Sequence, residues 1–170
     1  MSSNPKSGSR QFYAAYGNEL SEFFANAQRA YASGAAQPQT AEDGSSRIEY
    51  TDGEWSYVDL WYGGEPYSGL TTICYQGVAC WSMVYWGRIM PYAQDKKAVL
   101  AALMEALSHN TNREQPWRGP HKYTASDGMR YKNTWKGGMR CFSGTEIITD
   151  RTLKETLYTA TYMGGIINKD

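Results

Sequence analysis

Tyr57-Val58-Asp59-Leu60-Trp61-Tyr62-Gly63-Gly64 decides the fold of this chain, because the same pattern returns further along. The second copy is Tyr131-Lys132-Asn133-Thr134-Trp135-Lys136-Gly137-Gly138. A Ser-Gly pair follows each copy, at Ser68-Gly69 and at Ser143-Gly144. Self-similarity that keeps its order predicts an internal duplication. Two copies predict a pseudo-two-fold domain, because a solenoid needs three or more repeats.

The length and charge of the chain set the outer limits of its organisation. A chain of 170 residues predicts one domain. We expect a flexible tail over 1–9 and a single duplicated domain over 10–170, with halves of about 18–90 and 94–167. The formal net charge is zero, which predicts no direct binding of nucleic acid. No apolar run is long enough to cross a bilayer, so we expect no membrane partner.

The cysteines indicate the compartment. Cys74, Cys80 and Cys141 cannot all pair within one chain, and their spacing matches no CxxC or Cys/His metal site. We therefore expect no metal and no cofactor. The three residues are interpreted as reduced, buried thiols, which predicts a cytoplasmic protein.

The apolar periodicity and the turn residues predict an α+β fold. We expect one helix from Asn18, as N-cap, to Gly34, and a second helix over 94–109. An earlier turn of the first helix, over 10–16, would break at Gly17. The segment 34–46 is expected to be a loop. Eight antiparallel strands are expected over 47–51, 54–62, 69–75, 78–86, 121–125, 129–136, 145–149 and 156–163. Each half is then a helix followed by a meander, with both helices packed on one face of the sheet.

Side-chain alternation separates two faces of the repeated strand. The face of Tyr57, Asp59 and Trp61 keeps its chemistry in the second copy, and the opposite face does not. The corresponding face of the second copy consists of Tyr131, Asn133 and Trp135. We interpret this face as the inner one and the other as solvent-facing in the second half.

Asp59 and Asn133 are the informative residues of the inner face. A polar side chain between two aromatic rings must find a hydrogen-bond partner or lose a few kcal/mol, roughly. One interpretation is that each is satisfied locally, by backbone or by a tyrosine hydroxyl. The other is that both line an aromatic pocket between the halves and fix the polar atoms of a flat ligand.

Further residues complete the candidate ligand-binding set. They are Tyr85, Arg88, Trp117, Arg118, Glu146 and Tyr162. Arg88 is either functional or a solvated strand end, since the second copy has Gly165 in its place. Trp117-Arg118 is either a hinge anchored by a buried ring or a loop whose arginine reaches an anionic group. No catalytic residue is assigned, because neither histidine belongs to a diagnostic motif.

Several segments resemble a bacterial domain family of unknown function, found alone or fused after helix-turn-helix modules of the lambda-repressor type. The resemblance is carried by Ala27-Gln28-Arg29-Ala30-Tyr31-Ala32, Gly63-Gly64-Glu65-Pro66-Tyr67-Ser68-Gly69, Trp81-Ser82-Met83-Val84-Tyr85-Trp86-Gly87-Arg88, Trp117-Arg118-Gly119-Pro120, Leu157-Tyr158 and Tyr162-Met163-Gly164-Gly165-Ile166. The family tends to carry a Glu two residues after the Ser-Gly glycine. Glu146 fits this pattern, whereas the first half has Thr71. The resemblance implies a sensory or effector domain and no established catalytic residues.

Three functions remain open at this point. The leading hypothesis is a small-molecule-binding domain, sensory or sequestering, for an aromatic or nucleotide-like ligand. An enzyme of hydrolase type would use Glu146 with Arg118 or His121 in the same cleft. A protein-interaction domain would use exposed Tyr62, Trp86 and Tyr92, and a homo-oligomer is compatible with this interpretation.

Overall fold

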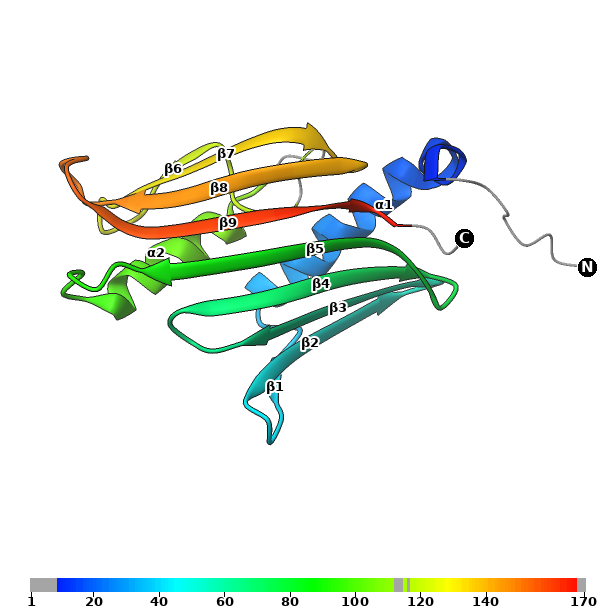
Figure 1. Ribbon diagram of the computed structural model, residues 1–170, viewed down its shortest axis with the longest axis horizontal. Coiled ribbons are helices and arrows are strands. Elements are labelled where there is room, and N and C mark those ends of the chain that lie inside the picture. The colour runs from blue at the N-terminus through cyan, green and yellow to red at the C-terminus, as the bar shows by residue number, and fades with distance from the viewer. Residues whose placement is uncertain (1–8, 112–114, 116, 168–170) are drawn as a thin grey trace, which may run out of the picture.

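The protein is an α+β domain built on one antiparallel sheet (Figure 1). The computed structural model describes residues 9–111, 115 and 117–167. The elements of these residues, in chain order, are α1 (Ser9–Ala32), β1 (Gln39–Thr40), β2 (Ser45–Asp52), β3 (Trp55–Tyr62), β4 (Tyr67–Tyr75), β5 (Val78–Ile89), α2 (Lys96–Ser108), β6 (Lys122–Thr124), β7 (Arg130–Gly138), β8 (Cys141–Thr149) and β9 (Thr156–Ile166).

The sheet has nine strands in the order β1-β2-β3-β4-β5-β9-β8-β7-β6. Every neighbouring pair is antiparallel, and the two longest strands, β5 and β9, meet at the centre. Figure 1 shows a meander on each side of this central pair. The expected α+β class and the antiparallel sheet are thereby confirmed.

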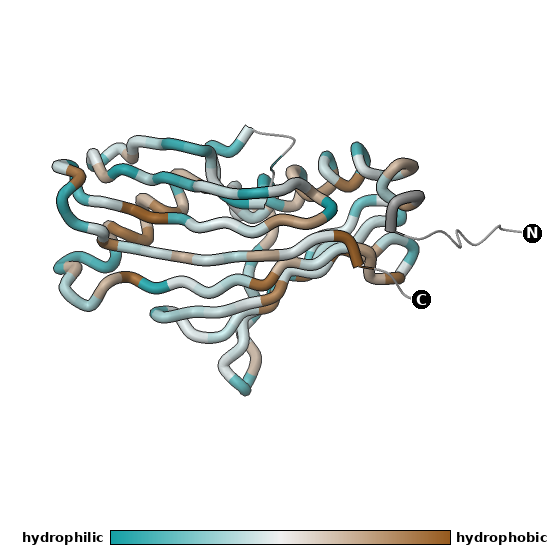
Figure 2. The backbone as a smooth tube through the Cα atoms, turned by 45° about the horizontal axis from the view of Figure 1, so that its top comes forward, coloured by the Kyte–Doolittle hydropathy of each residue, from teal (hydrophilic) through white to brown (hydrophobic). Residues whose placement is uncertain are grey.

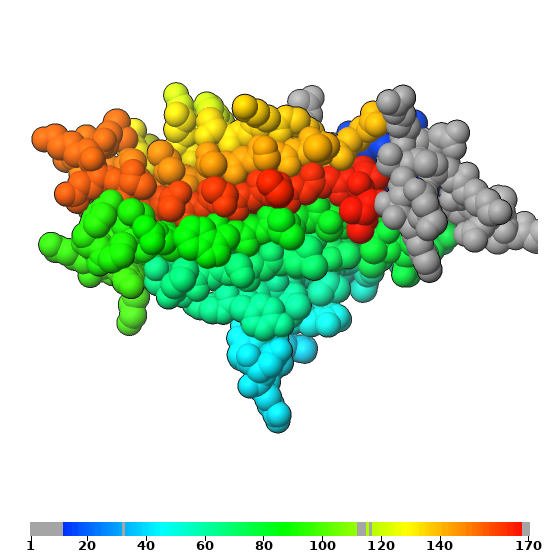
Figure 3. All heavy atoms as spheres, viewed as in Figure 1, coloured from blue at the N-terminus to red at the C-terminus, as the bar shows by residue number. Residues whose placement is uncertain are grey.

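Both helices lie on one face of the sheet. Helix α1 contacts β2 and β3, and α2 contacts β7 and β8. Asp95 caps α2 by accepting a hydrogen bond from Ala98 N at 2.9 Å. In Figure 1 the helices lie behind the strands, and Figure 3 shows the opposite face with its strands uncovered. The apolar interior therefore lies between helices and sheet, and a large sheet face meets solvent.

The interior divides into two clusters of buried side chains. One is centred on Leu20 and Phe24 of α1 with Ile73 and Trp81 of the sheet. The other joins α2 to the far strands and β9 through residues such as Leu103, Ile148 and Tyr158. The brown, apolar segments of Figure 2 lie on helices and strands alike. The boundary between the clusters falls near the middle of the sheet.

The first helix is longer than expected. It begins at Ser9, so Asn18 is not its N-cap and Gly17 does not break it. A Cβ on Gly17 would lie 2.9 Å from the Tyr13 ring, so glycine lets this ring lie against the helix. Tyr16 packs on Tyr75 of the sheet at a centroid distance of 4.8 Å. Tertiary packing here overrides the low helix propensity of glycine.

The loop and the strand ends also differ from expectation. The expected loop 34–46 contains β1, where Gln39 pairs with Arg47. Most strands extend beyond their expected ends. The pairing between β8 and β9, for example, continues to Cys141 and Gly165. The expected flexible tail lies outside the described residues, apart from Ser9.

The assignment of faces is confirmed. Tyr57, Tyr131 and Asn133 are buried, whereas Lys132 and Lys136 on the other face are exposed. The expectation of three buried thiols is met fully by one residue, met in part by a second and wrong for the third. Cys80 is buried and Cys74 half-buried, but Cys141 is exposed at the start of β8.

Candidate functional site

A polar cluster lies beneath the centre of the sheet, between the two apolar clusters. We call it the seam cluster. Its members are Asp59, Thr71, Tyr85, Arg118, Gly119, Tyr131, Asn133, Glu146 and Tyr162. All of them except Thr71 and Gly119 belong to the ligand-binding set expected from sequence. Buried groups of this kind are stable only when their hydrogen bonds are made, so the contacts decide what the cluster can do.

An ion pair forms the centre of the seam cluster. Nε of Arg118 donates to Oε2 of Glu146 at 2.9 Å, and Nη2 donates to the same oxygen. The Glu146 side chain is fully buried, and that of Arg118 is 10% exposed. The hydroxyl of Tyr131 donates to Oε1, so both carboxylate oxygens have partners. Glu146 is therefore held as an acceptor by three donors.

The loop after α2 delivers Arg118 because its neighbour is anchored. The Trp117 ring is fully buried and stacks on Phe142 of β8 at 4.2 Å between centroids. Gly119 N donates to the Tyr131 hydroxyl at 3.1 Å, which fixes the other side of the arginine. The contacts of Trp117 are those of a buried anchoring ring, which is one of the two interpretations from sequence. The neighbouring Arg118 points into the seam cluster.

Electrostatics keep the arginine charged. Burial disfavours its charge, but the carboxylate of Glu146 and neighbouring tyrosines outweigh this effect, so the pKa of Arg118 lies well above its usual value. Burial, followed by the charge of Glu146, raises the pKa of Tyr131. At neutral pH the cluster contains a guanidinium and a phenol, and the phenol serves as a donor.

Asn133 is satisfied by its surroundings. Its Nδ2 donates to Gly119 O at 2.9 Å, and its Oδ1 accepts from the Tyr162 hydroxyl at 2.6 Å. Its backbone oxygen lies 2.8 Å from Nδ1 of His121, whose ring is exposed. Asn133 therefore orients the loop of Arg118 rather than offering a free amide.

Asp59 occupies a less closed position. Its Oδ1 accepts from Thr71 at 2.8 Å and from Tyr85 at 2.9 Å. Burial raises the pKa of Asp59, although the two hydroxyl donors and the charge of Arg118 oppose the rise. The guanidinium of Arg118 lies 5.7 Å from the Tyr85 ring centroid. Because Tyr85 also donates to Asp59, its ring connects the Arg118–Glu146 ion pair with the aspartate.

One side-chain polar atom of Asp59 and one of Arg118 have no hydrogen-bond partner among the described residues. Among the described residues, neither Oδ2 of Asp59 nor Nη1 of Arg118 has a hydrogen-bond partner. Neither of these two atoms is fully buried. Solvent therefore reaches an acceptor and a donor in the same cluster.

Two glycines of the sheet make room for Tyr85 and Tyr162 of the seam cluster. A Cβ on Gly69 would lie 2.3 Å from the Tyr85 hydroxyl, and one on Gly144 would lie 2.3 Å from that of Tyr162. Each glycine faces its tyrosine across paired strands. The Ser-Gly pairs in the sequence are the signal that could have predicted these contacts.

The remaining expected residues lie elsewhere. Tyr57 is a core residue whose hydroxyl accepts from Gln28 at 3.2 Å. Trp61 and Trp135 are partly buried at the edge of the core. Arg88 lies on the opposite face of the sheet from Tyr85, so it is not brought to the seam cluster.

Sequence reasoning missed three tyrosines near Arg118. Tyr67 and Tyr158 share a hydrogen bond between their hydroxyls, and both influence the pKa of Arg118. Burial raises the pKa of Tyr31 in α1, and Asp59 and Arg118 also act on it. These residues come from separate elements, so strand alternation alone could not group them.

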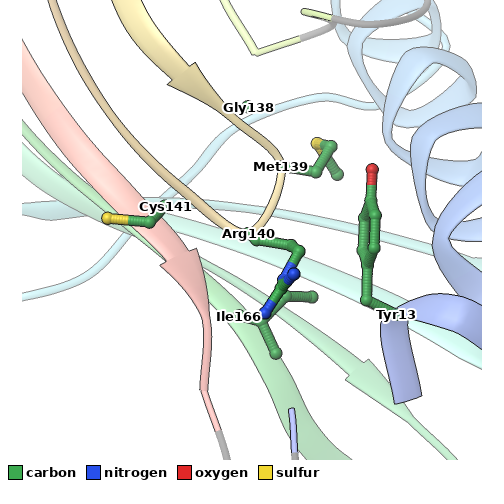
Figure 4. A pocket seen from close by; sticks show the side chains of 6 residues that line it. All are labelled: Tyr13, Gly138, Met139, Arg140, Cys141 and Ile166. Atoms are coloured by element: carbon green, nitrogen blue, oxygen red, sulfur yellow. The ribbon is translucent and has the colours of Figure 1, made fainter. Parts of the chain in front are cut away.

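A separate pocket of about 360 Å³ lies at the β7–β8 turn. Tyr13 of α1, Met139 and Arg140 of the turn and Cys141 at the start of β8 contribute to its wall. Figure 4 shows the Tyr13 ring beside Met139 and Arg140. None of the expected ligand-binding residues lines it.

Metal-binding groups and membrane-spanning helices are absent from residues 9–111, 115 and 117–167. Within these ranges no group of three or more His, Cys, Asp or Glu is placed to hold a metal ion. No helix in this part of the chain is long and apolar enough to cross a membrane.

The fold and the cluster define a class of protein: an α+β domain with a single antiparallel sheet, helices on one face and a buried arginine–glutamate pair beneath its centre. The chain belongs to the family of a domain of unknown function, DUF5680, whose model matches residues 59–167. The resemblance to a family of unknown function is confirmed to that extent. The comparison with curated proteins gave no match, and neither did the comparison with solved structures.

Proposed function

We propose that this domain binds a small planar molecule at the seam cluster, in a sensory or ligand-sequestering role. The ligand carries a hydrogen-bond donor beside an acceptor, as nucleobases and related heterocycles do. The proposal is supported by two unpaired atoms, Oδ2 of Asp59 and Nη1 of Arg118, in a cluster whose other polar atoms are engaged. An acceptor and a donor of this kind match the two complementary groups of such a ligand.

The surroundings favour an aromatic ligand. Tyr67, Tyr85 and Tyr158 lie near the guanidinium, and their hydroxyls are already directed to protein partners. Tyr85 and Tyr158 are buried, whereas the ring of Tyr67 is only partly buried and can contact a ligand. Rings in this setting pack against a planar molecule without losing hydrogen bonds. Arg118 is fixed by Glu146 before any ligand arrives, so little conformational entropy is lost on binding.

A duplicated origin of the two halves is part of the proposal. In the first half Asp59 faces Thr71, and in the second Asn133 faces Glu146 at the corresponding step of the hairpin. Asp59 accepts from Tyr85 as Asn133 accepts from Tyr162. The side chains at these corresponding positions differ between the halves. In the second half Glu146 holds Arg118, and in the first half Asp59 is available to a ligand.

Ligand binding is favoured over a hydrolase function because hydrogen bonds occupy both carboxylate oxygens of Glu146. A general acid or base needs an oxygen within reach of its substrate, and both oxygens of Glu146 are occupied by Arg118 and Tyr131. His121 is exposed and bonds to the Asn133 backbone. Of the three expected interaction residues, Tyr62 and Trp86 point away from this cluster to the other sheet face. The third, Tyr92, is exposed after β5 and donates a hydrogen bond to Thr156 O.

The test is a thermal-shift screen with nucleobases, nucleosides, mononucleotides and planar heterocyclic dyes, followed by calorimetry of the best compound. We expect Asp59→Asn to weaken its binding about tenfold or more, because the acceptor Oδ2 becomes a donor and a hydrogen bond to a charged group is worth about 1.5–3 kcal/mol. Glu49→Gln, which changes an exposed carboxylate on the other face, is the matched control and should bind as the parent does. The proposal fails if no compound stabilises the protein, or if the two variants bind equally well.

A further inference from the structure

The uncovered face of the sheet has a strongly uneven charge. Strands β5 to β9 contain five cationic residues, and all five point to the open face. They are Arg88, Lys122, Arg130, Lys132 and Lys136. Glu146 is the one acidic residue in these strands, and it points inward. We call this part of the sheet the basic face.

The cations are concentrated on the outer strands. Lys132 pairs in register with Lys122 of β6, and Arg130 and Lys136 lie on the same side of β7. Among the described residues, none of the five forms an ion pair. On the other half of the sheet Arg47 is paired with Glu49 at 2.5 Å, so its charge is compensated. The zero net charge of the chain therefore hides a local excess of positive charge.

An exposed tryptophan lies beside these cations. Trp86 is 43% exposed, and its cross-strand neighbour is Thr161. The same row continues through Thr145 to Thr134, which lies between Lys132 and Lys136 on β7. Three strand spacings separate Trp86 from Thr134, a distance of about 14 Å. The row thus joins an aromatic ring to the cations through exposed hydroxyls.

A groove runs next to this row. Its volume is about 630 Å³, and Val84, Met163, Ser143 and Lys136 contribute to its wall. Val84 faces Met163 in register, Met163 faces Ser143, and Ser143 faces Lys136, so the groove crosses four strands. Val84 and Met163 make one end of the groove apolar, and Lys136 places an amine at the other end. Figure 3 shows these strands open to solvent.

We propose that the basic face binds single-stranded nucleic acid. Unpaired cations bind the phosphates, Trp86 stacks on a base, and the groove takes a neighbouring base against Val84 and Met163, with Lys136 at the backbone. The exposed tryptophan and the base-sized groove favour single strands, because the bases of a duplex are stacked and paired. Charge complementarity selects a polyanion, and this site lies on the opposite side of the sheet from the seam cluster.

One neighbouring acid limits the extent of the proposed site. Glu65, in the turn between β3 and β4, accepts a hydrogen bond from Ile89 N at 2.5 Å, next to Arg88. The site is therefore centred on β7 rather than on β5. Lys132 and Lys136 are the cations to test, since both are exposed and neither has an acidic partner among the described residues.

The experiment is fluorescence anisotropy with labelled single-stranded RNA and DNA, repeated over a series of salt concentrations. We expect salt-sensitive binding that the double variant Lys132→Glu/Lys136→Glu weakens about tenfold or more. The same variant should reduce the salt slope by about 1.4, because each phosphate that a cation neutralises on a single strand contributes about 0.7. Trp86→Ala should weaken binding about fivefold or more, because the base no longer has a ring to stack on.

The matched control is Lys96→Glu/Lys97→Glu, which changes the net charge equally on the exposed start of α2. It should stay within about twofold of the parent, and circular dichroism melting should show every variant folded. Absence of binding overturns the proposal, as does an equal weakening in the control. Polyglutamate competing as well as the oligonucleotide, or sedimentation showing that a second copy of the chain covers this face, also overturns it.

Discussion

Nε of Arg118 lies 2.9 Å from Oε2 of Glu146, and the glutamate has no exposed surface. The arginine comes from the loop after α2, whereas the glutamate belongs to β8. The pair therefore fixes a loop to the sheet and places a guanidinium against Tyr85 from the other half. Both the proposed ligand site and the stability of the domain depend on this geometry.

Removal of the charge on Glu146 should destabilise the domain severely. Glu146→Gln leaves the buried guanidinium of Arg118 without its counter-ion, and breaking a buried pair in this way costs about 3–5 kcal/mol. Urea unfolding followed by circular dichroism measures the loss, with exposed Glu155→Gln as the control. The double variant Arg118→Met/Glu146→Gln should lose less than the sum of the single variants, and simple additivity would contradict a coupled pair.

Asp59→Asn should raise the free energy of unfolding at neutral pH. Burial raises the pKa of Asp59 in the folded protein, so its charged form is disfavoured there relative to the unfolded chain. The stability associated with this group is complete below its unfolded pKa and is lost as pH rises through the folded pKa. The asparagine, which retains an acceptor for Thr71 and Tyr85, escapes that loss. Melting curves over a pH series should show the advantage disappearing in acid, and an advantage independent of pH would refute this origin.

Gly69 and Gly144, which face Tyr85 and Tyr162 of the seam cluster, should tolerate no side chain. Gly144→Ala places a Cβ 2.3 Å from the Tyr162 hydroxyl and 2.8 Å from Thr134 O, and such overpacking costs about 1–3 kcal/mol. Gly138→Ala is the matched control in the same hairpin, since a Cβ there meets nothing within 4 Å. Thermal unfolding should separate the two variants by several degrees, and equal melting temperatures would contradict the close approach.

The cysteines should differ sharply in reactivity. Burial raises the pKa of Cys80 to about 12, so its thiolate is scarce at neutral pH, whereas Cys141 is exposed. Alkylation with mass-spectrometric mapping should label Cys141 first and Cys80 only on unfolding. The variant Cys141→Ser should remove the fast phase, and fast labelling of Cys80 in the folded protein would show that it is not enclosed.

Local pattern predicts the strands well because alternation is a local property. The inner face of Tyr57 and Tyr131 and the outer face of Lys132 and Lys136 follow directly from a period of two residues. The first helix is longer than its pattern predicts, since its early turns depend on Tyr16 meeting Tyr75, a residue far away in sequence. The short strand β1 escapes prediction for a related reason. Two residues in a polar segment carry no periodicity, and only their partner in β2 defines them.

The sequence by itself determined the α+β class, the two faces of the repeated strands and most members of the seam cluster. Tertiary structure decided which of these residues meet: it joined Arg118 to Glu146, left Arg88 on the far face and added Tyr67 and Tyr158. It also decided that a chain of zero net charge carries five cations on the open face of β5 to β9. The physical reason is that alternation and composition are properties of single segments or of the whole chain. Burial, ion pairing and surface charge depend instead on which segments the fold brings together.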